Sequence, residues 1–150
     1  MNFGFWISDF GLVIQRMTSV DEETFKRRTR LFALAIIQLV ESPARTNVAQ
    51  VIGKQLLRSG TSVGANYRAS CRGKSALDVM AKLGIVEEET DESLYWLELL
   101  VEGGIEPADR VDPLMKEANE MLAMTVASVK TMRARKQYAS ATTANPKSKI

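Results

Sequence analysis

The sequence contains no histidine and a single cysteine, Cys71, among its 150 residues. Without histidine, the chain cannot form a Ser-His-Asp or Cys-His catalytic group, a Glu-x-x-His carboxylate site or a histidine-based zinc site. One cysteine cannot form an internal disulfide, and its occurrence beside seven methionines is typical of a reducing compartment. We therefore expect a cytoplasmic protein with no metal site and no cofactor.

Long apolar runs are also missing. The most apolar stretch, residues 31–40, covers ten residues and includes Gln38, whereas about 20 are needed to span a bilayer. The aromatic residues near the N-terminus follow no basic segment and are interrupted by Asp9, which argues against a signal peptide. We predict no membrane partner, and we interpret residues 1–20 as disordered or as a mis-assigned start.

Apolar residues recur at helical spacing in four segments, and nothing from Asp21 to Gln137 alternates with the period of a strand. The predicted helices run from an N-cap at Asp21 to the Ser42-Pro43 stop, and over about residues 47–70, 75–103 and 113–136. Short connections between amphipathic helices make consecutive helices antiparallel neighbours. The sequence therefore predicts an all-α, up-down four-helix bundle over residues 21–137.

Local signals fix the predicted helix ends. Thr46 or Asn47 can cap the second helix, and Asp112-Pro113 is typical of an N-cap and first helical residue. Gly103-Gly104 supplies a C-terminal stop for the third helix. Residues 138–150 are rich in Ala, Ser, Thr, Asn and Lys, so we predict a disordered basic tail there.

Two short motifs resemble catalytic or nucleotide-binding patterns. Residues 60–64, Gly-Thr-Ser-Val-Gly, match the nucleophile elbow, which requires a strand-to-helix turn and a histidine. Gly73-Lys74-Ser75 matches the end of a P-loop, but Arg68 stands where that loop needs a glycine. The first motif is better explained as a stripe of small residues between packed helices, and the second as a basic turn. The sequence therefore indicates no enzyme and no small-molecule substrate.

Charge is unevenly distributed although the net charge is only +2. Residues 58–74 hold four bases and no acid, residues 87–98 hold six acids and no base, and residues 130–150 hold six bases and no acid. The acids fall within one predicted helix, which favours a solvated or ion-paired face over a calcium loop. The bases are candidate phosphate contacts. They are Arg68, Arg72 and Lys74 beside Tyr67, and Arg133, Arg135 and Lys136 near the C-terminus.

The cluster around Arg68 has two interpretations. Three cations can contact phosphates while Tyr67 stacks on a base, but an ordinary solvated helix end has the same composition. Cys71 lies among these bases, which would lower the pKa of its thiol. In the acidic helix, Glu92 is predicted to point partly inward, and an inward carboxylate needs a partner such as Arg58 or Asn66.

Two segments carry a resemblance to a known family. Residues 55–68, QLLRSGTSVGANYR, contain Arg58, Ser62 and Asn66 at four-residue spacing, and residues 92–100, ESLYWLELL, supply the acid Glu92. Over about residues 24–132 the chain resembles the bacterial four-helix-bundle proteins encoded in intervening sequences of large-subunit ribosomal RNA. A related member is the accessory variability determinant of diversity-generating retroelements. Residues 67–70, Tyr-Arg-Ala-Ser, depart from the usual Ile-Ala-Glu-Gly.

The resemblance implies a left-handed bundle that assembles as a ring-like homopentamer, with proposed nucleic-acid binding and no known catalysis. It also implies a structural polar network of Arg58, Ser62, Asn66 and Glu92. The leading hypothesis is accordingly a non-enzymatic homo-oligomer that binds RNA or DNA through its basic residues as an accessory protein. The alternative is a structural or protein-interaction module in which the acidic helix meets the basic end of a neighbouring subunit.

Overall fold

The computed structural model describes residues 21–41 and 46–144. These residues form four α-helices, α2 (Asp21–Val40), α3 (Asn47–Cys71), α4 (Ala76–Glu102) and α5 (Ala108–Ala144), and no strand occurs among them. The predictions for residues 1–20 and for the Ser42-Pro43 stop lie outside the described residues. The all-α class predicted from the sequence is confirmed.

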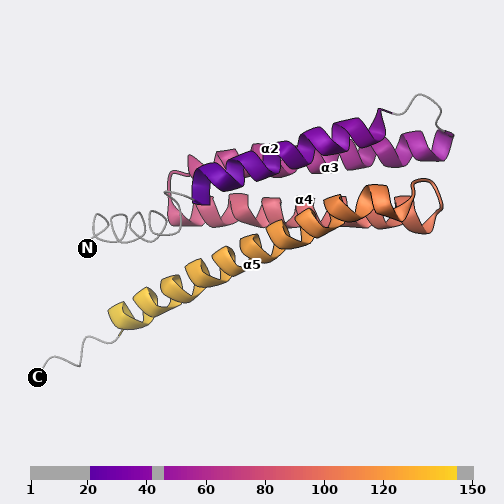
Figure 1. The fold of residues 1–150 in the computed structure, drawn as a ribbon. Helices are drawn as coiled ribbons and strands as arrows, with labels where there is room; N and C mark the ends of the chain where they lie inside the picture. Colours follow the sequence, from indigo (N-terminus) through magenta and orange to yellow (C-terminus); the bar gives the residue numbers. More distant parts are fainter. Residues whose placement is uncertain (1–20, 42–45, 145–150) are drawn as a thin grey trace, which may run out of the picture.

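The helices pack in chain order (Figure 1). α2 packs against α3, α3 against α4 and α4 against α5, whereas α2 and α5 share a smaller contact. Figure 1 shows α5 diverging from α4 toward its C-terminal end, so the last turns of α5 extend beyond the other helices. These sequential contacts agree with the predicted up-down bundle, and the left-handed sense stays a prediction.

Capping residues explain where α3 and α4 begin. The Thr46 hydroxyl accepts a hydrogen bond from the Ala49 amide at 3.2 Å, and the Ser75 hydroxyl accepts one from the Asp78 amide at 3.1 Å. Both residues are extended N-caps, which is the arrangement that satisfies an otherwise unpaired helix amide. After α4, Gly104 adopts a positive φ of 67° and turns the chain toward α5.

The predicted bounds of the fourth helix are wrong at both ends. α5 begins at Ala108 instead of Pro113, which lies inside the second turn of the helix and has no backbone N–H to donate there. It continues to Ala144, so residues 138–144 are helical and not disordered. Alanine is the best helix former, and the hydroxyls of Ser140, Thr142 and Thr143 donate to carbonyls four residues earlier. Residues 145–150 lie outside the description.

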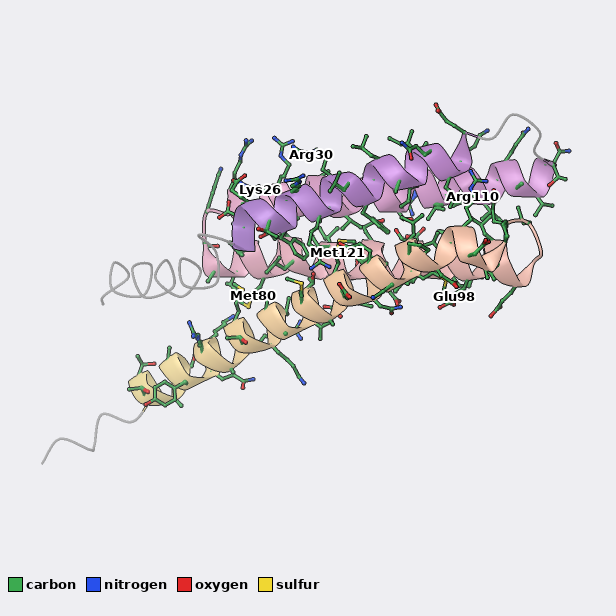
Figure 2. All side chains as sticks on the ribbon, in the orientation of Figure 1. Lys26, Arg30, Met80, Glu98, Arg110 and Met121 are labelled. Carbon is green, nitrogen blue, oxygen red and sulfur yellow. The ribbon has the colours of Figure 1, made fainter. Side chains whose placement is uncertain are left out.

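The core is formed by the inward stripes of all four helices. Its largest fully buried side chains are Phe32, Ile36, Leu56, Leu97, Leu100 and Met121. Figure 2 shows Met121 between α5 and the other helices, whereas Lys26 and Arg30 point outward from α2. A smaller cluster of Val79, Leu83 and Val129, with Tyr67 and Met132 packed against it, joins α3, α4 and α5 at the end where α4 begins.

Candidate functional site

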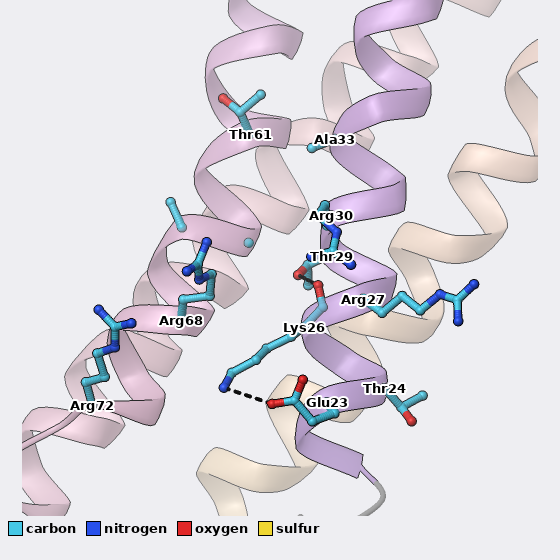
Figure 3. A pocket seen from close by; sticks show the side chains of 12 residues that line it. Glu23, Thr24, Lys26, Arg27, Thr29, Arg30, Ala33, Thr61, Arg68 and Arg72 are labelled. Carbon is cyan, nitrogen blue, oxygen red and sulfur yellow. Dashed lines mark hydrogen bonds and ion pairs between the residues drawn. The ribbon is translucent and has the colours of Figure 1, made fainter.

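A groove runs along the surface between α2 and α3 and encloses about 740 Å³. Its floor contains small residues from both helices, namely Thr29, Ala33, Gly64 and Ala65. Five bases and one acid, Glu23, complete most of the lining (Figure 3). The bases are Lys26, Arg27 and Arg30 from α2 and Arg68 and Arg72 from α3. We call this surface the basic groove.

The groove exists because small residues let α2 and α3 approach closely. A β-carbon added to Gly64 would lie 3.1 Å from the Thr29 hydroxyl oxygen, and one added to Gly60 would lie 2.2 Å from Ile36 Cδ1. No large side chain therefore fills the floor, and the long cationic side chains stand at its sides. The predicted role of Gly60 and Gly64 in close helix packing is confirmed.

Helical spacing gathers the cations into two rows. Residues four apart lie on the same face of a helix, about 6 Å apart along its axis. Lys26 and Arg30 are related in this way on α2, as are Arg68 and Arg72 on α3. Figure 3 shows Arg68 and Arg72 on the α3 side and Arg30 on the α2 side, while the Arg27 guanidinium points away from α3.

The cations of the groove differ in their partners. Lys26 contacts Glu22 at 2.7 Å and Glu23 at 3.4 Å, and its hydrogen bond to Glu22 is the main reason why the pKa of Lys26 is raised. No ion pair joins Arg30, Arg68 or Arg72 to another residue in the described part of the chain. These three guanidinium groups are therefore available to an external anion.

The bases on the α2 side of the groove were not predicted from the sequence as a binding site. Residues 26–30, Lys-Arg-Arg-Thr-Arg, contain four bases, and this run was the available signal. Arg28 within the run has another role, because it hydrogen-bonds Glu117 at 2.7 Å and Glu120 at 2.7 Å and so links α2 to α5. The contact with Glu117 is the main cause of the raised pKa of Arg28.

The residues around the end of α3 that were predicted to contact nucleic acid do not all lie together in the structure. Arg68 and Arg72 line the basic groove, whereas Lys74 lies in the turn before α4, where its amide donates to Asp78 Oδ2 at 3.1 Å. Tyr67 is half-buried, and its ring packs against Phe25 with the ring centroids 4.4 Å apart. This packing argues against the predicted use of Tyr67 as a platform for a base.

Known proteins resemble the chain over most of its described length. The family model of the 23S rRNA-intervening sequence protein matches residues 22–127. The chain belongs to this family. The resemblance stated from the sequence is thus confirmed.

A crystal structure of a protein from Bacteroides thetaiotaomicron also matches the chain. It is described as a protein with unknown function from the S23 ribosomal protein family. It shares 31% sequence identity with this chain, with a TM-score of 0.66, and the match covers 73% of this chain and 97% of that protein. No curated protein matches the chain.

The matched residues of this 23S rRNA-intervening sequence protein include the whole basic groove but not the end of α5. Arg133, Arg135 and Lys136 lie beyond residue 127 and are exposed on α5. Because Met132 packs in the small cluster with Tyr67 and Val79, these bases follow at the end of the bundle where α3 ends. They form a second basic surface, separate from the groove.

The polar network implied by the family resemblance divides into two parts. Arg58, which with Asn66 was one of the two partners predicted for Glu92, forms an ion pair with Glu92 and lies 3.6 Å from Glu89. Trp96, which the sequence analysis did not assign to the network, donates its indole N–H to Glu92 at 3.1 Å. The hydrogen bond from Arg58, followed by that from Trp96, lowers the pKa of Glu92.

Ser62 and Asn66 bond within their own helix. The Ser62 hydroxyl donates to the Arg58 carbonyl at 2.7 Å, and the Asn66 amide donates to the Ser62 carbonyl at 2.9 Å. The four-residue spacing of these residues thus reflects one helix face. Arg58, Glu92 and Trp96 form a side-chain cluster between α3 and α4, which we call the α3–α4 clamp.

The environment of Cys71 differs from the prediction. Burial raises the pKa of the Cys71 thiol, and the nearby carboxylate of Glu22 raises it further. The predicted lowering of this pKa by neighbouring bases is wrong, because the negative charge of Glu22 reaches the thiol across the α2–α3 contact. An activated thiol is therefore not part of the candidate site.

In the described part of the chain, no group of three or more His, Cys, Asp or Glu residues could hold a metal ion. Within the same residues, no helix is long and apolar enough to cross a membrane.

Proposed function

We propose that this chain is a non-enzymatic, homo-oligomeric accessory protein that binds nucleic acid through the basic groove. The observation that carries the proposal is that Arg30, Arg68 and Arg72, which form no ion pair with another described residue, lie on one concave surface. Arginine presents a planar fork of N–H donors that matches a phosphate group with two parallel hydrogen bonds. The groove thus offers charge and geometry suited to a phosphodiester backbone.

The binding mechanism is neutralisation of phosphates. Each base that contacts a phosphate releases counterions from the nucleic acid, so affinity falls as salt concentration rises. The exposed bases of α5, Arg133, Arg135 and Lys136, extend the contact beyond the groove. In a homopentameric ring, five copies of these surfaces would sum to a positive field far larger than the net charge of one chain suggests.

A gel-shift titration of the full chain with RNA and with DNA tests this function. We expect retardation at low salt that weakens steeply at moderate salt, because the contact is electrostatic. Light scattering of the free protein measures the number of subunits, with a pentamer as the expected result. Absence of retardation for both nucleic acids at low salt would contradict the proposed binding function.

A protein-interaction module is the second candidate function, and the outward face of α4 favours it. Glu88, Asp91 and Glu98 are exposed there, and no ion pair joins them to another described residue. This acidic row complements the basic end of α3 in charge, so one copy could dock on the next. Under this function, Arg72→Glu with Lys74→Glu dissociates the assembly in light scattering. Under the first function, the assembly stays intact and only nucleic-acid binding is lost.

A further inference from the structure

We infer that the basic groove binds the backbone of one single strand in preference to a duplex. This inference rests on the proposed function and assigns the class of nucleic acid to the same site. It follows from the width of the groove, from the spacing of its arginines and from the residue types that line it.

The width of the groove is set by two helices packed side by side. Packed helix axes lie about 8–10 Å apart, and α2 and α3 approach closely at Gly60 and Gly64. A concave surface of this width is narrower than a duplex, whose major groove alone is about 12 Å wide. A duplex therefore meets only the rim of the groove, whereas the backbone of one strand can lie along its floor.

Arg30, Arg68 and Arg72, the groove arginines without an ion pair in the described part of the chain, follow the axis of the groove. The close approach of Thr29 to Gly64 places Arg30 beside the middle of α3. Arg68 lies about 6 Å farther along α3 and Arg72 about another 6 Å beyond it. Neighbouring phosphates of one strand are farther apart than the axial rise of about 3.4 Å per stacked nucleotide, because the backbone winds around the stack, so each step of about 6 Å between arginines spans one to two phosphates. A strand laid along the floor would contact all three arginines at once.

Among the residues that the structure describes, no aromatic side chain lines the groove. Single-strand sites that hold bases inside the protein use aromatic residues as stacking platforms. The rings of Tyr67 and Phe25, which are each adjacent in sequence to groove residues, pack against each other instead. We therefore expect the phosphates to face the floor and the bases to face solvent, with little preference for sequence.

Fluorescence anisotropy of a labelled oligonucleotide tests the inference. The probe is used as a single strand of RNA, as a single strand of DNA, and annealed to its complement as a blunt duplex. With the full-length protein at low salt, we expect both single strands to bind at least about tenfold more tightly than the duplex. The logarithm of the affinity should fall with the logarithm of salt with a slope at least as steep as about −2, because the three groove arginines alone neutralise about three phosphates on a single strand.

Two variants test whether the single-strand preference and the salt dependence come from the arginines of the groove. Arg68→Gln with Arg72→Gln removes two of the three arginines, so the slope should shrink by about 1.4 and the preference for single strands should disappear. Lys116→Gln, on the exposed surface of α5, should leave both unchanged. Circular dichroism confirms that each variant stays helical.

The outcomes separate the inference from the function on which it rests. Equal or tighter binding of the duplex by the wild type, or a single-strand preference that survives in the double variant, overturns the inference while nucleic-acid binding stands. Failure of every probe to bind overturns both.

Discussion

Single residues set the turn between α3 and α4, and Gly73 is the most constrained of them. A β-carbon there would lie 2.3 Å from Val79 Cγ2, 3.1 Å from the Ser70 carbonyl oxygen and 3.2 Å from the Val79 amide nitrogen. Two of these atoms belong to the backbone and cannot rotate away. The turn therefore depends on the absence of a side chain at this position.

We predict that Gly73→Ala lowers the free energy of unfolding by about 1–3 kcal/mol, the usual cost of overpacking. Gly84→Ala is the matched control, because nothing lies within 4 Å of its added β-carbon and alanine gains up to about 1 kcal/mol in a helix. Urea denaturation of both variants measures the difference. Similar midpoints for the two would contradict the packing described for the turn.

The α3–α4 clamp makes a pH-dependent contribution at the residue scale. Hydrogen bonds from Arg58 and Trp96 lower the pKa of Glu92 in the folded protein. The clamp therefore stabilises the fold fully above the pKa of an unfolded glutamate, and this stabilisation is lost as pH falls through the folded pKa. Both charged side chains are partly exposed, so the contribution is small.

Glu92→Gln should accordingly shift the urea midpoint of unfolding slightly downward at neutral pH, by less than Gly73→Ala does. At a pH below the folded pKa of Glu92, the wild type is also neutral at this position and the two midpoints should converge. Denaturation curves at both pH values measure this. A difference between the two urea midpoints that stays the same at acid pH would show that the charge of the Glu92 carboxylate does not contribute to stability.

At the scale of the helices, the sequence predicts the bounds of a helix well where a capping residue or a terminating glycine marks its end. The predicted bounds of the second and third helices differ from α3 and α4 by one residue, because Thr46, Ser75 and Gly103 supply local hydrogen bonds or turns. α5 lacks such a stop. Its last residues have the composition of a polar tail, but the high helix propensity of alanine favours its continuation to Ala144. The serine and threonine hydroxyls there bond to carbonyls of the preceding turn and do not end the helix.

The end of α5 should be dispensable for the fold of the bundle. Residues 133–144 are mostly exposed, and the last cluster contact of the helix is made by Met132. We predict that truncation after Met132 changes the thermal midpoint by less than about 4 °C, since little apolar surface is lost. The same truncation should weaken nucleic-acid binding through loss of Arg133, Arg135 and Lys136. Thermal melting and gel shift measure the two effects, and a large loss of stability would contradict this view of α5.

At the scale of the whole molecule, the basic groove is a product of tertiary structure. Arg68 and Arg72 were recognisable in the sequence, but their partners on α2 are about 40 residues away, and the pairing of α2 with α3 brings them together. Arg28 and Arg30 are two residues apart, yet one is paired with Glu117 and Glu120 while the other faces the groove. Helix periodicity predicts which faces are polar. It does not predict which polar face meets another.

The net charge of +2 conceals this arrangement. The exposed acids of α4, Glu88, Asp91 and Glu98, do not line the basic groove, so the molecule presents a local positive field there despite its near balance of charges. Location, and not total charge, is therefore what a test of the function must address.

The most direct test compares two variants with the same total charge. Arg68→Glu with Arg72→Glu reverses two charges in the groove, and Lys54→Glu with Lys116→Glu reverses two exposed charges outside it. In a gel shift with single-stranded RNA at low salt, we predict that the groove variant loses at least about tenfold in affinity, while the second variant stays within about threefold of the wild type. An equal loss in both variants, or no loss in the groove variant, would contradict the assignment of nucleic-acid binding to the basic groove.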